Sequence, residues 1–170
     1  MKIININGPI NSGKSTVSKL LIEKIDKSLF IEVDDLLSDE EQEILGLTME
    51  EGWAERTNRL SKLINQYKEN KQYDVIVFAY PITKKLYDEW KAWEDKNSLF
   101  INITLSPCLE ICLKNRGQRE LEEWEINRIK QMYDEGYNKR EYANLIIDNS
   151  AQTPQETVDE ILRFLNGQSV

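Results

Sequence analysis

The apolar positions of the chain fall into two kinds of segment that alternate along its length. Short apolar runs rich in β-branched residues favour strands, and they occupy residues 1–7, 29–33, 75–79, 99–105 and 144–147. Between them, apolar residues recur every three or four positions, as in Val17, Leu20, Leu21 and Ile25. Five repeats of strand then helix predict an α/β fold in which a parallel sheet is covered on both faces.

Four of the predicted helices carry further detail. Trp53, Leu60, Leu63, Ile64 and Tyr67 form one apolar stripe, which we expect to be buried. Trp90 and Trp93 are expected to be core residues of the following helix. Ser106 and Pro107 are predicted to be the N-cap and first residue of the helix after the fourth strand, and Thr153 to Glu156 to be a capping box. Because no linker or repeat interrupts this pattern, we expect residues 1–170 to form a single domain.

The overall charge narrows the classes of partner. Thirty acidic residues against 22 basic ones give a net charge of −8, which argues against nucleic-acid binding. The N-terminus does not resemble a signal peptide and no stretch approaches a membrane span, so we expect a cytoplasmic protein without a membrane partner. We expect it to be a monomer or a weak homodimer. The chain has no histidine, so any general base must be a carboxylate, Lys, Tyr or Cys.

The most specific motif lies between the first predicted strand and the first predicted helix. Residues 8–15 read G-x-x-x-x-G-K-S, the P-loop, in the strand–loop–helix context that the motif requires. Its backbone N–H groups and the helix N-terminus can bind phosphates, Lys14 can reach the β- and γ-phosphates, and the Ser15 hydroxyl can hold Mg²⁺. The residues predicted to bind the nucleotide here are Gly8, Asn11, Ser12, Gly13, Lys14, Ser15 and Thr16.

Two acids lie at the end of the second predicted strand, where P-loop proteins need a metal-binding acid and kinases need a group for the acceptor hydroxyl. Glu32 and Asp34 are two residues apart, so both point to one side if the strand is still extended. We predict that Glu32 faces the metal through water and that Asp34 reaches the acceptor hydroxyl. The alternative is that these acids only cap and solvate a loop.

Two further segments should lie at the carboxyl end of the sheet, where open α/β sheets bind ligands. The acidic segment 38–52 is a candidate substrate or lid element, although acidic runs are usually solvated faces. A lid is predicted at about residues 116–122, where Arg116 and Arg119 flank Gly117. Arg119 would stabilise charge on the transferred phosphoryl group.

Taken together, the P-loop, the Glu32-x-Asp34 pair and Arg116-x-x-Arg119 resemble the small-molecule kinases related to shikimate kinase, a group that includes adenylylsulfate kinase, gluconate kinase and chloramphenicol phosphotransferase. The resemblance implies a P-loop NTPase fold, a three-layer sandwich with strand order 2-3-1-4-5 and a small lid. It implies ATP and Mg²⁺ as cofactors, with Asp34 as base or orienting group and Arg119 in the lid. Arg116 and the turn at residues 152–154 would flank the adenine.

The resemblance does not name the acceptor. Shikimate kinase has a glycine run after strand three, where this chain has Ala79-Tyr80-Pro81, and its acceptor-carboxylate arginine pattern is not reproduced, although Arg56 and Arg59 lie in that region. We therefore predict an ATP-dependent phosphotransferase acting on a hydroxyl of a small molecule. Two alternatives stay open, a nucleoside monophosphate kinase and a nucleotide-binding switch.

Overall fold

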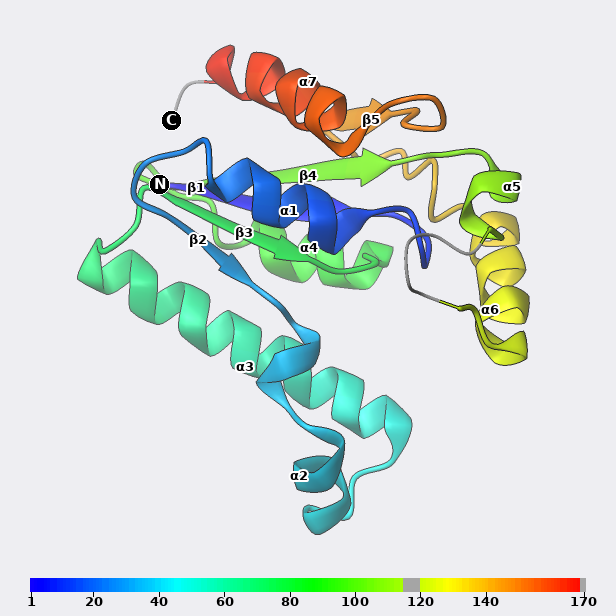
Figure 1. Ribbon diagram of the computed structural model, residues 1–170. Coiled ribbons are helices and arrows are strands. Elements are labelled where there is room, and N and C mark those ends of the chain that lie inside the picture. The colour runs from blue at the N-terminus through cyan, green and yellow to red at the C-terminus, as the bar shows by residue number, and fades with distance from the viewer. Residues whose placement is uncertain (115–119, 169–170) are drawn as a thin grey trace.

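The computed structural model describes residues 1–114 and 120–168, and its centre is one five-stranded sheet (Figure 1). The strands are β1 (Lys2–Asn7), β2 (Ser28–Ile31), β3 (Val75–Ala79), β4 (Leu99–Leu105) and β5 (Leu145–Ile147). All neighbouring pairs are parallel, and the order is β2-β3-β1-β4-β5. The α/β class and the strand order expected from the sequence are confirmed.

Helices cover both faces of the sheet, as the alternating pattern predicted. The covering helices are α1 (Lys14–Ile22) and α7 (Pro154–Asn166) on one face, and α3 (Met49–Asn70) and α4 (Lys84–Lys91) on the other. The remaining helical elements lie beyond the carboxyl ends of the strands (Figure 1): the 3₁₀ turn η1 (Asp34–Leu36), α2 (Asp39–Ile44), α5 (Leu109–Cys112) and α6 (Glu123–Asp134). Within the described ranges, no helix has the length and apolar character of a membrane span.

Each face of the sheet has its own core. The first is aliphatic and packs Val17 and Leu21 of α1, with Val158 and Ile161 of α7, against the sheet. The second is aromatic: the rings of Trp90 and Trp93 stack with centroids 5.4 Å apart, and Phe78 meets Trp90 edge-on at 5.1 Å. Trp90 and Trp93 are therefore core residues, as predicted, and hold α4 onto the sheet.

Buried polar side chains tie the central strand to the segment that follows β3. The side-chain amide of Asn5 donates to Asn102 Oδ1 at 3.0 Å, and that of Asn7 donates to Thr104 Oγ1 at 2.8 Å, both across the β1–β4 pair. The Oδ1 atoms of the same two asparagines accept the backbone N–H groups of Tyr80 and Ile82, at 3.1 and 2.9 Å. The loop after β3 is thus hydrogen-bonded to the middle of the sheet.

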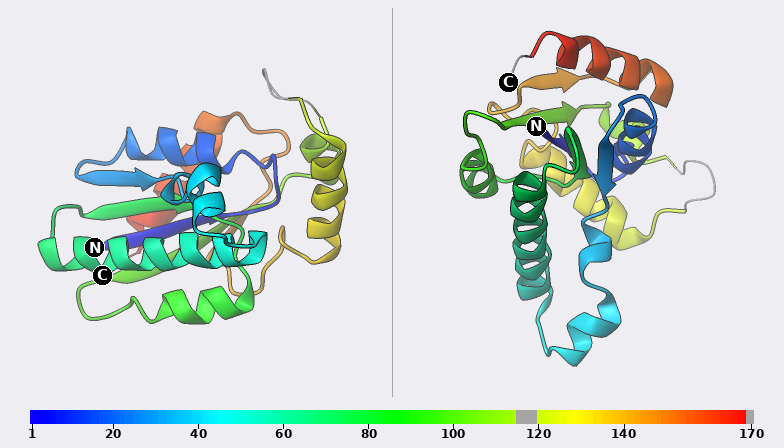
Figure 2. Two further views of the ribbon diagram at one scale, coloured as in Figure 1. Left: turned by 90° about the horizontal axis from the view of Figure 1, so that it is seen from below. Right: turned by 90° about the vertical axis from the view of Figure 1, so that its left-hand side faces the viewer.

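Three local predictions were wrong. The strand β2 ends at Ile31, and Val33 already has helical dihedral angles, so the chain is not extended through Asp34. The helix expected at Ser106 begins two residues later, after Cys108, because the Ser106 N–H still donates to Ile147 O of β5. Trp53 is 49% exposed rather than core, since α3 extends past the sheet at its N-terminal end (Figure 2). The capping box at Thr153 is confirmed.

Candidate active site

The P-loop has the backbone geometry that a phosphate-binding loop needs. Gly8, Asn11 and Gly13 all have positive φ angles, of 147°, 62° and 94°. A Cβ atom at Gly8 would lie 2.7 Å from Leu105 O and from Ser12 Oγ, so only glycine fits there. Because Gly13 is the N-cap of α1 and has no side chain, nothing at that position covers the N–H groups of the first turn, which can receive an anion.

One side chain outside the loop and one within it hold the loop in place. The amide of Asn149, just after β5, donates to Ser12 O at 3.1 Å. The amide of Asn11 donates to Cys112 O at 2.8 Å and to Lys114 O at 2.9 Å. The side chain of Asn11 therefore fastens the loop to the end of α5 and to the residue two positions beyond it.

Lys14 lies across the loop that it would serve. Its Nζ donates to Gly8 O at 3.1 Å and to Pro9 O at 2.7 Å, so the ammonium sits above the concave side of the loop. A flexible ammonium in this place can exchange the two carbonyl oxygens for phosphate oxygens without any change in the backbone.

Ser15 and Glu32 meet where a metal ion would be needed. The Ser15 hydroxyl donates to Glu32 Oε1 at 3.3 Å, and Lys19 Nζ lies 3.9 Å from Glu32 Oε2. Burial raises the pKa of the Glu32 carboxyl above its ordinary value, and the negative charge of Asp34 raises it further, against the lowering effect of the Ser15 hydrogen bond. A bound cation would favour the ionised form of this carboxyl.

A single large cleft joins these groups to Asp34. Its volume is about 1970 Å³, above the roughly 300–1,000 Å³ of an ordinary small-molecule pocket. Lys14, Ser15, Glu32 and Asp34 all line it. Glu32 and Asp34 therefore line one cleft, but the η1 turn, rather than the expected extended strand, brings Asp34 there.

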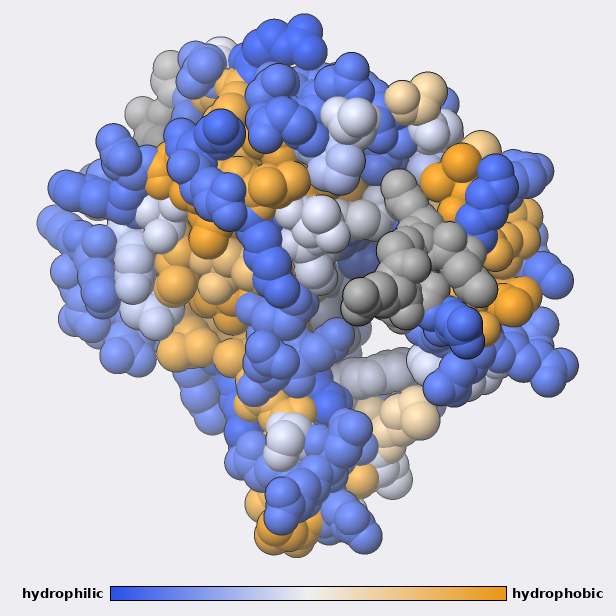
Figure 3. All heavy atoms as spheres, in the orientation of Figure 1, coloured by the Kyte–Doolittle hydropathy of each residue, from blue (hydrophilic) through white to orange (hydrophobic). Residues whose placement is uncertain are grey.

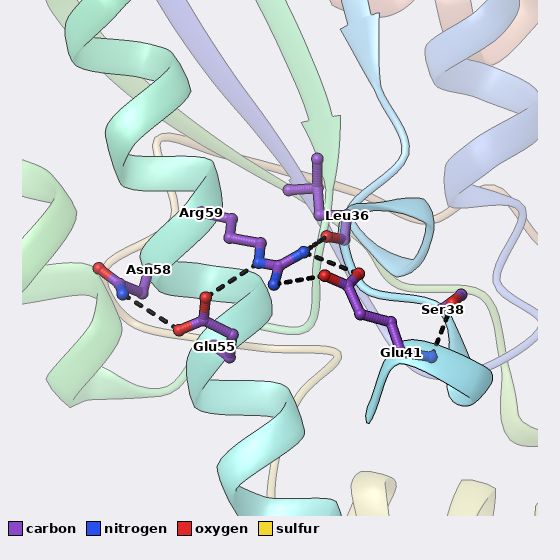
Figure 4. Close-up of polar contacts among 6 residues, drawn as sticks. All are labelled: Leu36, Ser38, Glu41, Glu55, Asn58 and Arg59. Carbon is purple, nitrogen blue, oxygen red and sulfur yellow. Dashed lines mark hydrogen bonds and ion pairs between the residues drawn. The ribbon is translucent and has the colours of Figure 1, made fainter. Parts of the chain in front are cut away.

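The two arginines of α3 have different surroundings. Arg59 binds Glu41 with two hydrogen bonds of 2.9 Å, Glu55 with a third of 2.9 Å, and the Leu36 carbonyl (Figure 4). Its charge is matched by the two carboxylates, whose hydrogen bonds raise the pKa of the Arg59 guanidinium, and the guanidinium in turn lowers the pKa of the Glu41 carboxyl. Arg56 lies one turn earlier, is only 7% exposed, and lines the cleft with Asp34. Of this pair, Arg56 is the candidate for ligand binding.

Apolar and aromatic side chains line the outer part of the cleft. Met49 and Trp53 stand on α3 and Trp124 on α6, and they are 66%, 49% and 61% exposed. The space-filling view shows the molecule hollowed between the end of the molecule that carries α2 and the side that carries α6 (Figure 3). Tyr80 also lines the cleft, and burial raises the pKa of its hydroxyl to about 12. Such walls can cover the carbon skeleton of a ligand.

Comparison with known proteins identifies the family of this chain. The family model described as shikimate kinase matches residues 10–166. The chain belongs to the shikimate kinase family. A curated shikimate kinase from Sulfurihydrogenibium sp. (strain YO3AOP1) is 28% identical over 162 residues, which cover 95% of this chain and 96% of that relative.

Solved structures agree on the fold. A shikimate kinase from Acinetobacter baumannii, in complex with shikimate, superposes with a TM-score of 0.58 at 21% identity, covering 99% of this chain and 95% of its own. A gluconokinase from Sinorhizobium meliloti 1021 superposes with a TM-score of 0.66 at 18% identity, covering 97% and 91%. Membership of the shikimate kinase family makes the chain an ATP-dependent phosphotransferase that acts on a hydroxyl group of a small molecule, as predicted.

The nucleoside monophosphate kinase alternative loses its structural basis. It needs several arginines free to hold an acceptor phosphate, and Arg59 is occupied by Glu41 and Glu55. The predicted lid residues Arg116 and Arg119 lie outside the described residues. Of the lid segment 116–122, the structure describes residues 120–122, and there Glu122 caps α6.

The sequence analysis missed two residues of the site, Asn149 and Gln42. Asn149 could have been found, because polar residues that follow a core strand lie at the ligand-binding edge of the sheet. The Gln42 side chain donates a hydrogen bond to Thr48 O and accepts one from Arg56. It could not be found in this way, because it lies in an acidic segment whose composition is typical of a solvated face. The contact between Gln42 and Arg56 is set by how α2 packs on α3, which no motif encodes.

Proposed function

We propose that this enzyme transfers the γ-phosphate of ATP to a hydroxyl of a small carboxylic acid, with Mg²⁺ bound at Ser15 and Glu32. The observation that carries the proposal is that Asp34 and Arg56 line the same cleft as Lys14 and Ser15. The P-loop, the Asp34 carboxylate and the buried Arg56 guanidinium therefore line one cleft. The shikimate kinases among the relatives make shikimate the first acceptor to test.

The transfer follows from these positions. The acceptor hydroxyl oxygen attacks the γ-phosphorus in line with the bridging oxygen to the β-phosphate, and its proton passes to the Asp34 carboxylate. The new O–P bond forms as the bond to the bridging oxygen breaks, and ADP leaves. Lys14 and the N–H groups of the P-loop hold the phosphate oxygens as charge moves to the leaving group.

The donor set near the phosphates suits magnesium. Mg²⁺ usually keeps several waters and takes one or two protein oxygens together with substrate phosphates, so it needs no cluster of acids. No group of three or more His, Cys, Asp and Glu side chains forms a metal cage within the described ranges. Ser15 and Glu32, joined at 3.3 Å, supply one hydroxyl and one carboxylate in the right place. Bound there, the ion would neutralise phosphate charge.

Replacing Glu32 with glutamine tests the metal role. The amide keeps the shape of the side chain and a partner for Ser15, but it loses the charge. We expect about 10- to 100-fold weaker apparent Mg²⁺ affinity, measured as activity against free Mg²⁺ at fixed ATP. Glu23→Gln, an exposed change at the end of α1, is the matched control. Equal Mg²⁺ dependence in the Glu32 variant and the control would rule out this role for Glu32.

The acceptor class rests on Arg56. A buried guanidinium needs a counter-charge, and its charged partner, Asp39, is fully exposed and 3.5 Å away. A carboxylate on the acceptor would complete the pairing, while Met49 and Trp53 cover its carbon skeleton.

An acceptor panel tests this class directly. ADP release is measured with ATP, Mg²⁺ and shikimate, other hydroxylated carboxylic acids, the methyl ester of shikimate, and neutral polyols. We expect turnover of at least one acid, and a KM about tenfold or more higher for an ester of that acid, since one charge-assisted contact is lost. Turnover of neutral acceptors alone would rule out the carboxylate, and a rate of ADP release that no acceptor in the panel increases would contradict the transfer.

A further inference from the structure

We infer that Gln42 and Gly52 are positioning residues for acceptor binding, because together they place the Arg56 guanidinium in the cleft. The inference rests on the proposed function, in which Arg56 holds an anionic group of the acceptor. It assigns a purpose to two residues, one on α2 and one on α3, that do not themselves carry charge.

Gly52 is buried on the first turns of α3, where glycine is unfavourable for the helix. A Cβ atom at this position would lie 2.2 Å from Gln42 Oε1 and 2.4 Å from its Cδ. The amide of Gln42 therefore lies directly against the backbone of α3, in space that any other residue at position 52 would fill. Glycine at this position leaves room for the amide, at a cost in helix propensity.

The amide of Gln42 uses both of its ends. Its Oε1 accepts a hydrogen bond from Arg56 Nη1 at 3.0 Å, and its Nε2 donates to Thr48 O at 3.3 Å. The same Thr48 carbonyl accepts the backbone N–H of Gly52 at 2.8 Å. One side chain of α2 is thereby fixed to the first turn of α3 and, through it, to Arg56.

Arg56 depends on this contact more than on its other neighbours. The contact with Asp39 is 3.5 Å long, and the Asp39 side chain is fully exposed, so water weakens it. Arg56 Nε is buried and finds no hydrogen-bond partner among the described residues. Without Gln42, the guanidinium would lose its shortest hydrogen bond and could turn away from the cleft.

The packing of α2 on α3 does not itself require Gln42. Arg59, one turn further along α3, already joins α3 to Glu41 of α2 through two hydrogen bonds of 2.9 Å (Figure 4). Those contacts do not involve Gln42 or Gly52. The Gln42 contact is therefore separable from the packing of the two helices, and its specific effect is on Arg56.

A double-mutant cycle with Gly52→Ala, Gln42→Ala and both together tests the inference. We expect each single variant to raise the acceptor KM about tenfold, as for one lost hydrogen bond to a charged group, with the ATP KM unchanged. The double variant should be no worse than either single one, because both act through the same contact. Gly167→Ala, the same substitution at the end of α7, should change neither KM.

The thermal stability of the same four proteins shows whether the Gln42 amide occupies the space beside residue 52. With Gln42 replaced by alanine, the space beside residue 52 is open, so adding Gly52→Ala should raise Tm by about 2–4 °C through helix propensity. In the presence of Gln42 the same change should give no such rise, because the amide is displaced. Should Gly52→Ala fail to fold, Gln42→Ala still decides the question through the acceptor KM.

Arg56→Ala separates failure of the inference from failure of the proposed function. If Arg56→Ala leaves the acceptor KM unchanged, Arg56 does not hold the acceptor, and the proposed anchor and the inference both fall. If Arg56→Ala raises that KM but Gln42→Ala and Gly52→Ala do not, the anchor stands and the inference is wrong. A rise in the acceptor KM in all three variants supports both.

Discussion

Replacing Lys14 with alanine is expected to lower kcat for phosphoryl transfer about 10³-fold while the fold is retained. The ammonium lies 3.1 Å from Gly8 O and 2.7 Å from Pro9 O, above the loop that would receive the phosphates. In the ternary complex it would bind oxygens whose charge grows as the β–γ bridge breaks, and losing one such preorganised donor costs about 10²–10³-fold in rate. The side chain is only partly buried, so the loss of stability should be small.

The measurement is steady-state turnover together with thermal unfolding in the absence and presence of ATP. Lys24→Ala, which removes an exposed ammonium just beyond α1, is the matched control. The Lys14 variant should also lose most of the Tm increase that ATP gives to the wild type, since ligand stabilisation follows affinity. A rate within tenfold of the wild type would mean that Lys14 does not contact the transferred phosphate.

Asp34→Asn is expected to lower kcat by about 10²–10⁴-fold, the usual contribution of a positioned acid or base, with little change in the ATP-dependent Tm shift. Asparagine has nearly the same shape but cannot accept the acceptor proton. Asp34 lies on η1, outside the P-loop, so nucleotide binding should survive. The neighbouring exposed Asp35 gives the control: Asp35→Asn should stay close to wild type. Undiminished turnover in Asp34→Asn would contradict the role given to Asp34.

The parts of the fold that follow from local pattern were predictable. The P-loop is one contiguous motif whose geometry depends on two glycines and the start of a helix, so residues 8–15 alone indicate it. The capping box at Thr153 and the core role of Trp90 likewise depend on spacing within one helix, and Trp93 follows two residues after the end of α4. The strand order came from the resemblance to a known group, because alternation of strands and helices does not determine it.

The parts that depend on packing between elements were not predictable from pattern. Whether β2 ends at Ile31 or Val33 decides how Glu32 and Asp34 point, and that end is set by pairing with β3. Trp53 continues the apolar stripe of α3, yet the sheet does not extend far enough to cover it. The Gln42–Arg56 contact joins residues that are 14 positions apart on two helices. Its only trace in the sequence is Gly52, a glycine inside α3. The roles of Arg116 and Arg119 stay predictions.

The two walls of the cleft should differ in how easily they unfold locally, because the asparagines of β1 hold only one of them. The amides of Tyr80 and Ile82 bond to Asn5 and Asn7 at the centre of the sheet, so their hydrogen exchange requires disruption of the core. The opposite wall begins with α2, a six-residue helix with no buried residue. Its amides can exchange through local fraying. Of these two walls, the α2 side should therefore bear most of the entropic cost of ordering around an acceptor, while the wall that carries Tyr80 and Ile82 stays rigid.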